Sequence, residues 1–425
     1  MSSQGDPSVT AASAAAPDHA VVRGAAIATF IIFGTNGFIF ASWAARIPAV
    51  TQTLDLSTGE MGLILLVGAI GSLCAMPLVG PTAGRIGIVR TVRLGGFLAV
   101  LAGGAIALGL VLHAVVVVAA GLALFGVGIA FWDVGQNIAG ADVEHRLGRT
   151  IMPQLHAGFS GGAVVGALVG AGLSAMGVPL PVHLAAIMVA VVLIMVFVPR
   201  HFVPLTAHEA PESGAAEEAD DGASPATAPK EPGGALAAWT DRRTLLIGVV
   251  VLGATLTEGA GNDWISKGVV DGLGTSEAAG AALFAVFVGA MTVARWFGGR
   301  IIDRLGRVLA LRLSMVSALV GLSMYSLSGI YWISGLGALL WGLGAALAFP
   351  MGMSAASDDP RHAASRVSVV ATIGYIAFLA GPPFLGFLGD HVGLRLALLA
   401  ILVPIAVALV LAGATRKPDE PPTAG

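Results

Sequence analysis

Three polar side chains lie at the end of a long apolar segment. Asp133, Gln136 and Asn137 follow the run HAVVVVAAGLALFGVGIAFW. Positions i, i+3 and i+4 share one face of a helix, so the three predict a single polar stripe. A charge at the centre of a bilayer costs at least about 2.5–3.5 kcal/mol, and such residues usually face a cavity or a partner and often carry protons. We therefore predict that Asp133 is a proton-coupling residue and that the two amides bind substrate. The alternative is a permanent pair with an arginine or a place near the cytoplasmic surface.

A second polar group is divided between two other apolar segments. Glu258 stands beside the helix-loosening sequence GAG, and Asn262 follows one turn later. Asn36 lies in the first apolar segment, with Trp43 two turns further on. An indole that stacks on a sugar ring, with a carboxylate and amides that bind its hydroxyls, would make a sugar site, and Glu258 is a second candidate for proton coupling. The alternative is a set of hydrogen bonds between helices, worth about 0.6 kcal/mol each.

Four further polar residues have weaker signals. His156 lies near the cytoplasmic entrance of a candidate cavity helix, and Tyr375 corresponds to that helix in a repeat of the sequence. Both are predicted to bind substrate, although an isolated histidine more often packs in a core. Arg295 is expected to reach the membrane surface or to brace a loop, and Arg46 to form an outer gate or an interface anchor.

The elements that carry these residues are predicted to be membrane helices. The chain has 425 residues, of which 56% are hydrophobic and 11% charged, with a mean hydropathy of +0.87. Soluble proteins have about 25% charged residues, and a membrane span requires about 20 apolar residues. Such runs predict an all-α membrane protein with twelve transmembrane helices, at residues 21–45, 60–80, 91–112, 114–140, 152–176, 181–199, 243–266, 278–298, 308–328, 330–355, 366–388 and 392–414.

The loops divide the chain and predict its orientation. The segment after the sixth span is acidic and rich in Pro, Ala and Gly, which is typical of a disordered linker. Most Lys and Arg residues fall in alternate loops, which predicts that both termini are cytoplasmic; only Arg46, Lys267 and Arg395 fall in outer segments. The predicted regions are a tail (1–20), a six-helix bundle (21–200), a cytoplasmic linker (201–241), a second bundle (242–414) and a tail (415–425).

The two halves resemble each other at an offset of roughly 220 residues. LFGVGIAFWDVGQNIAGAD is echoed by LWGLGAALAFPMGMSAASD, and GPTAGRIGIVR by GRIIDRLGRVL. Duplicated halves are a common plan of transporters, with the substrate site near the midplane between them. The single cysteine, Cys74, lies in an apolar run and is expected to be packed. We see no metal cluster, nucleotide loop or nucleophile triad in the sequence, which therefore predicts neither an enzyme nor a cofactor.

The second repeated loop resembles the signature of the major facilitator superfamily. The second half carries that pattern in full, at Gly299, Asp303, Arg304, Gly306 and Arg307. The first half matches at Gly80, Arg85 and Gly87, but Gly84 replaces the aspartate that helps to hold the outward-open state in the family. The resemblance implies two pseudo-symmetric six-helix bundles, a gating role for these loops and a monomer.

A narrower resemblance rests on NGFIFASWAARIP, WDVGQNIAGADVEHRLGR, MPQLHAGFSGGAVVGA and EGAGNDWI. These stretches are similar to bacterial fucose-permease-like facilitators and to a membrane protein linked to rhizopine. The fucose permeases have an acidic residue on the helix of Asp133, and the branch implies a small polyhydroxylated or amino-substituted substrate. We expect a proton-coupled symporter of a sugar, polyol or inositol-like solute in the cytoplasmic membrane. The alternatives are a proton-antiport exporter of drugs or metabolites and a membrane sensor without transport.

Overall fold

The computed structural model describes residues 19–149, 151–202, 238–359 and 362–417. Twelve of its helices are long and apolar enough to cross a membrane, which confirms the predicted number of spans. The predicted linker and both tails fall largely outside the described residues. The first half contains α1 (His19–Ala44), α2 (Ile47–Leu54), α3 (Thr58–Ile86), α4 (Ile88–Val111), α5 (Val115–Leu147), α6 (Met152–Ala175), α7 (Leu180–Phe197) and η1 (Pro199–His201).

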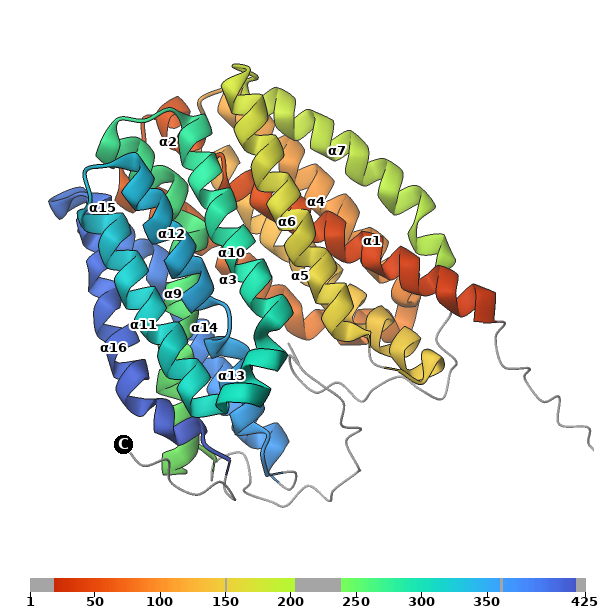
Figure 1. Cartoon of the computed structure of the whole chain (residues 1–425). Helices are drawn as coiled ribbons and strands as arrows, with labels where there is room; N and C mark the ends of the chain where they lie inside the picture. The colour runs from red at the N-terminus through yellow and green to blue at the C-terminus, as the bar shows by residue number, and fades with distance from the viewer. Residues whose placement is uncertain (1–18, 150, 203–237, 360–361, 418–425) are drawn as a thin grey trace, which may run out of the picture.

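The second half repeats this order. It contains α9 (Arg242–Leu273), α10 (Glu277–Leu305), α11 (Arg307–Leu327), α12 (Tyr331–Ala345), α13 (Ala348–Ala356), α14 (Ala363–Val392), α15 (Leu394–Ala397), η2 (Leu398–Ile401), α16 (Leu402–Leu411) and η3 (Ala412–Thr415). The two six-helix bundles stand side by side, with the first half at the right of Figure 1 and the second at the left.

Three local features differ from the sequence-based expectation. The short helix α2 follows the first span, and its proline at the first turn suits a helix start. Helices α5, α9 and α10 each continue about two turns beyond their predicted ends, to Leu147, Leu273 and Leu305. Cys74 is exposed on α3 instead of packed, because it lies on the outward side of its helix, where apolar side chains would meet lipid.

Pro350 breaks the tenth span into α12 and α13. The break at Ala346 and Leu347 lies one turn before this proline. A proline has no N–H to donate to the carbonyl four residues earlier, so the carbonyl of Ala346 is free of its usual helical bond. The proline therefore accounts for the interruption of the tenth span.

Glycines allow α1 and α6 to pack closely, as the four-residue spacing in GFSGGAVVGALVG predicts. A Cβ atom on Gly162 would lie 1.9 Å from the carbonyl oxygen of Gly34. A Cβ atom on Gly166 would lie 2.3 Å from the carbonyl oxygen of Phe38. Only glycine fits at these positions, so the stripe determines how near the two helices approach.

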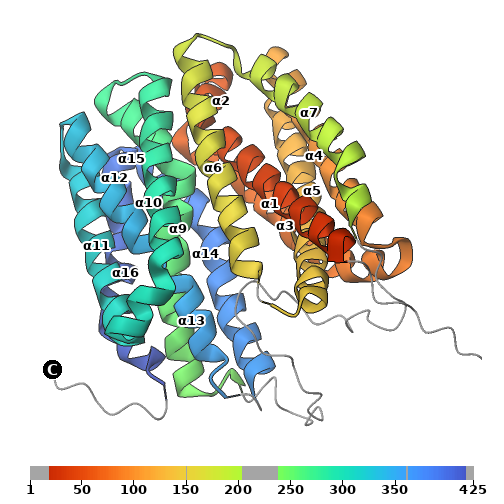
Figure 2. The ribbon, with the colours of Figure 1, turned by 45° about the vertical axis from the view of Figure 1, so that its right-hand side comes forward.

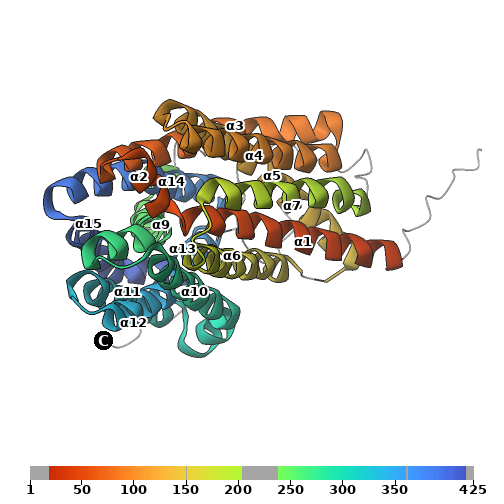
Figure 3. The ribbon, with the colours of Figure 1, turned by 90° about the horizontal axis from the view of Figure 1, so that it is seen from above.

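The halves meet mainly through two helix pairs, α3 with α14 and α6 with α10, and α9 also contacts α1 and α2. Figure 2 shows the two bundles diverging toward the end that carries α13. Seen from above, α6 runs beside α10 and α14 lies near α2 and α3 (Figure 3). We call the end that carries α2 the closed end.

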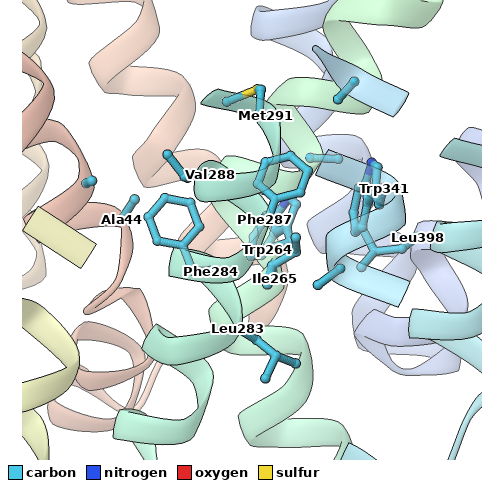
Figure 4. Packing of buried hydrophobic residues seen from close by; sticks show 14 of the residues in the cluster. Ala44, Trp264, Ile265, Leu283, Phe284, Phe287, Val288, Met291, Trp341 and Leu398 are labelled. Atoms are coloured by element: carbon cyan, nitrogen blue, oxygen red, sulfur yellow. The ribbon is translucent and has the colours of Figure 1, made fainter. Parts of the chain in front are cut away.

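A buried apolar cluster extends across the halves near the closed end. Phe284 of α10 points toward Ala44 of α1, and Trp264 and Phe287 continue the cluster into the second bundle (Figure 4). Polar contacts between the halves lie at the same end. They include the hydroxyl of Ser266, which donates to the carbonyl of Ala45 at 3.0 Å. The halves are therefore packed together at one end and separate at the other.

Candidate functional site

Asp133 is the centre of a small amide–carboxylate cluster on α5 and α1. The side-chain amide of Gln136 donates to its Oδ1 at 2.8 Å, and that of Asn36 donates to the same oxygen at 3.4 Å. Asn137 instead donates to the backbone carbonyl of Asp133 at 3.0 Å. Gln136 and Asn36 are buried, whereas Asp133 and Asn137 are half-buried. Of the predicted stripe, Gln136 thus bonds the carboxylate and Asn137 does not, and Asn36 is added from the first helix.

Asp133 is held by neutral hydrogen-bond donors and has no countercharge in the described structure. Among the described residues, no lysine, arginine or histidine lies within ion-pair distance of its carboxylate, and Oδ2 accepts no hydrogen bond. The residue lies near the middle of the 33-residue helix α5. At a rise of about 1.5 Å per residue, this is far from either membrane surface. The alternatives of an arginine pair and of a surface position do not describe this geometry.

Glu258 and Arg295 form the corresponding feature of the second half. The guanidinium of Arg295 lies 2.8 Å from Glu258 Oε2 and also donates to the carbonyl of Ala346 at 3.2 Å. This carbonyl is the one that Pro350 leaves free. Arg295 therefore pairs with a carboxylate in mid-membrane, and we find no brace to the loop signature of the kind that the sequence suggested.

His156 of α6 lies near residues of both halves. Its ring contacts Phe33 of α1 edge to face, with ring centroids 5.2 Å apart. It lies within range of the positive charge of Arg295, across the α6–α10 contact. Three buried polar atoms in this region accept no hydrogen bond: Asn36 Oδ1, Gln136 Oε1 and His156 Nε2. The middle of the protein thus holds two carboxylates, one guanidinium and several unused acceptors, from five helices of both halves.

The other predicted substrate residues differ in their surroundings. Trp43 is only 7% exposed and faces an apolar pocket between α1, α4, α5 and α7. Asn262 and Tyr375 are half-buried on α9 and α14. The structure therefore brings Asn36 and Gln136 to the carboxylate of Asp133. It places Trp43 among apolar side chains of the first bundle.

A family model described as the Major Facilitator Superfamily matches residues 155–382 and 264–425, which together make up more than half of the chain. The chain belongs to the major facilitator superfamily. Its fold and its twelve spans agree with this assignment, and it is a multi-pass membrane transporter. As in other facilitators, its partners include a small-molecule substrate.

Two curated relatives of this facilitator are similar over most of the chain. An uncharacterized transporter of Sinorhizobium fredii is 29% identical over 387 residues, which cover 88% of this chain and 96% of the relative. The membrane protein MosC of Rhizobium meliloti is 27% identical over 386 residues, covering 90% of this chain and 87% of MosC. The resemblance to the rhizopine-associated membrane protein, noted from the sequence, is thereby confirmed.

Solved structures agree on the fold of this facilitator. The nucleoside transporter NupG has a TM-score of 0.69 at 14% identity and covers 93% of this chain and 98% of its own. A bacterial homologue of the human lysosomal transporter Spinster has a TM-score of 0.68 at 12% identity, covering 94% of this chain and 98% of its own. At these identities the likeness concerns the fold alone.

The loop signature is built differently in the two halves of the facilitator. In the second half, Arg307 is buried and bonds both oxygens of Asp358 at 3.0–3.1 Å, and Arg243 bonds the same carboxylate at 2.7 Å. In the first half Ile88 takes the place of Arg307, and Asp142 pairs with Arg146 on its own helix at 3.0 Å. The remaining predicted loop residues lie at the surface or partly buried: Gly80, Arg85, Gly299, Asp303 and Arg304.

Sequence reasoning missed the polar residues at the closed end. Ser174, Glu277 and Asp390 join the two halves there. The repeat offers a signal, because Ser174 and Asp390 each lie three residues before a glycine with positive φ, Gly177 and Gly393. Neither position is hydrophobic, although each is close to the end of a membrane helix.

Proposed function

We propose that this facilitator moves a small polar solute, of the sugar, polyol or inositol class, by proton-coupled symport across the cytoplasmic membrane. The observation that carries the proposal is the mid-membrane carboxylate of Asp133, held by two amides and without a countercharge. A carboxyl group in this position can bind a proton in one state and release it in another. A permanent ion pair would prevent that.

The unused acceptors support a hydroxyl-bearing substrate. Asn36 Oδ1, Gln136 Oε1 and His156 Nε2 are buried and accept no hydrogen bond in the described structure. Leaving such a group unsatisfied costs about 1–3 kcal/mol. Hydroxyl groups of a polyol would donate to these atoms, whereas a lipophilic solute would leave them unpaired. This favours uptake of a polar solute over export of a lipophilic drug.

Glu258 and Arg295 provide a second proton-linked element. In the present state the carboxylate is paired with the guanidinium at 2.8 Å. If the pair separates during transport, Glu258 takes up a proton, because an isolated charge in the membrane is costly. Arg295 would then rest on the carbonyl of Ala346.

The charges of the loops give the direction in which the structure is open. The closed end carries Arg46 and Lys267, whereas most basic residues lie at the opposite end. By the positive-inside rule the closed end is the outer one. We infer an inward-open monomer in the inner membrane, with both termini in the cytoplasm and a site reached from inside.

The test uses purified protein in proteoliposomes. A panel of hexoses, deoxysugars, inositols, amino-inositols, nucleosides and lipophilic cations is first screened by thermal shift, because a ligand stabilises by RT ln(1 + [L]/Kd). Each ligand that binds is then tested for accumulation under an inward proton gradient. We expect a polyol-class solute to accumulate in proteoliposomes containing the wild-type protein and Asp133→Asn to abolish accumulation while solute exchange continues.

Asp142→Asn is the matched control, because Asp142 is on the same helix but pairs with Arg146 near its end. We expect it to accumulate solute like the wild-type protein. Normal accumulation by Asp133→Asn would disprove the proton role. Stabilisation only by lipophilic cations, with efflux against the proton gradient, would establish the exporter instead.

A further inference from the structure

Two of the polar contacts between the halves at the closed end lie on opposite sides of the molecule and join equivalent helix pairs, α3 with α14 and α6 with α10. On the first side, the carboxylate of Asp390 at the end of α14 accepts from the backbone N–H groups of Thr58 at 2.8 Å and Gly59 at 3.0 Å. These N–H groups belong to the first turn of α3, where a helix has no internal acceptors for them. A carboxylate from one half thus accepts hydrogen bonds from the free N–H groups at the start of a helix in the other half.

On the second side, the carboxylate belongs to the helix that begins at the closed end and not to the helix that finishes there. Glu277, at the start of α10, accepts from the hydroxyl of Ser174 at the end of α6, at 3.1 Å. The same carboxylate lies 3.2 Å from Nε of Arg46 in the loop after α1. Burial lowers the pKa of Arg46, and the charge of Glu277 opposes that effect. Among the residues that the structure describes, the side chain of Glu277 is therefore bound only to groups of the first half.

The repeat shows that these two contacts occupy equivalent positions. Ser57 and Ser276 are the N-cap residues of α3 and α10. Thr58 and Glu277 follow them as the first helical residues. At the other partner, Ser174 and Asp390 both lie three residues before a positive-φ glycine. The same pair of positions thus makes a carboxylate hydrogen bond on both sides, but the carboxylate has moved from one member of the pair to the other.

The surrounding backbone is shaped for this contact on the α3–α14 side. A Cβ atom on Gly62 would lie 2.6 Å from the carbonyl oxygen of Pro382, and one on Gly386 would lie 2.6 Å from that of Thr58. These distances are too short for any side chain. The two helices therefore approach closely enough for Asp390 to reach the N–H groups of α3, and separation of the halves would expose those groups.

We propose that Asp390 with α3, and Glu277 with Ser174, form two equivalent latches of opposite polarity that hold the closed end shut. Both latches break and re-form in each transport cycle. The proposal rests on the alternating access in the proposed function, but it concerns only the equilibrium between states and does not depend on the substrate. Charge-assisted hydrogen bonds of this kind are about twice as strong as neutral ones, so their loss shifts the equilibrium toward opening at this end.

The test measures the distance across the closed end in purified protein without substrate. Spin labels are placed at Gly172 and Gly329, where an added Cβ atom meets nothing within 4 Å; Cys74 is replaced by serine because it is exposed. We expect Asp390→Ala and Glu277→Ser each to increase the open fraction at least threefold. Asp390→Asn, which keeps one acceptor oxygen, should give a smaller increase in the open fraction. Because it is the milder change, it keeps the test valid if Asp390→Ala fails to fold.

The control and the rescue follow from the repeat. Glu60→Gln is the control, because Glu60 lies in the first turn of α3 but bonds only the N–H of Ser57 in its own half. The double variant Ser174→Asp with Glu277→Ser copies the α3–α14 polarity onto α6 and α10, and we expect it to return the open fraction toward the wild-type value. Unchanged distances in Asp390→Ala and Glu277→Ser, or failure of the rescue, would overturn the latches.

The outcomes also separate this proposal from the proposed function. A shift of the distances in the latch variants supports the latches even if no polyol is transported, in which case only the substrate class fails. Polyol transport with distances that do not respond to these variants would support the proposed function and disprove the latches.

Discussion

Arg295 and Glu258 form an ion pair at 2.8 Å between α10 and α9, near the middle of the second bundle. The carboxylate side chain is 18% exposed and that of the arginine 32%, so the pair is partly shielded from water. The same guanidinium donates to the carbonyl of Ala346. The pair is thus anchored on a third helix segment and is not a contact of two free side chains.

We expect removal of one member of this pair to destabilise the protein more than removal of both. Arg295→Gln leaves the carboxyl group of Glu258 without its partner, and hydrogen bonds to charged groups contribute about 1.5–3 kcal/mol. The double variant with Glu258→Gln leaves two neutral amides. Thermal unfolding in detergent measures the difference, and equal losses for the single and double variants would show that the pair is energetically unimportant.

Pro350→Ala should weaken the hydrogen bond from Arg295 to the carbonyl of Ala346, although the substitution does not change Arg295 itself. An alanine at this position has an N–H that can donate to the carbonyl of Ala346, which then competes with the guanidinium. We expect proton-driven accumulation to fall about fivefold with unchanged or higher thermal stability, since the helix becomes continuous. Pro77→Ala, at an exposed proline inside α3, is the control and should transport normally.

Asp358 should be more important for stability than its repeat counterpart Asp142. Asp358 bonds Arg307 and Arg243 from two other helices, so Asp358→Asn leaves two arginines without their shared carboxylate. For a buried pair such a change costs about 3–5 kcal/mol. Asp142→Asn affects one arginine on the same helix and should cost less. Equal losses in thermal unfolding would show that the asymmetry of the two loops has no energetic effect.

Asp241, the N-cap residue of α9, lies outside the membrane spans and predicts that thermal stability depends on pH. Burial tends to raise its pKa, but hydrogen bonds from Thr244 and the charge of Arg366 outweigh this and lower the pKa. A carboxyl group with a lowered pKa stabilises the fold above its unfolded pKa of about 3.9, and the stabilisation is lost as pH falls through the folded pKa. Asp241→Asn should therefore lower the melting temperature at pH 7, and the difference should shrink below about pH 4. A difference independent of pH would show that the N-cap geometry alone is responsible.

The apolar segments by themselves determined the number, type and order of the membrane helices. A span of about 20 apolar residues can satisfy its backbone only as a helix. All twelve spans appear in the expected order, although several continue one to two turns past their expected ends. The stripe of Asp133 and Gln136 was equally visible, because it depends only on helical periodicity. The eight residues of α2 were missed, because they are too short to stand out between two spans.

The partners of the polar residues were decided by the tertiary structure. Glu258 and Arg295 are separated by 37 positions and Asn36 and Asp133 by 97, and no local pattern links such residues. Trp43 has the periodicity of a site residue, yet the packing of α4 and α7 places it in an apolar pocket. The sequence determines which helices form, because that depends on neighbours along the chain. The packing of the helices determines which polar groups meet, because that depends on contacts between distant segments.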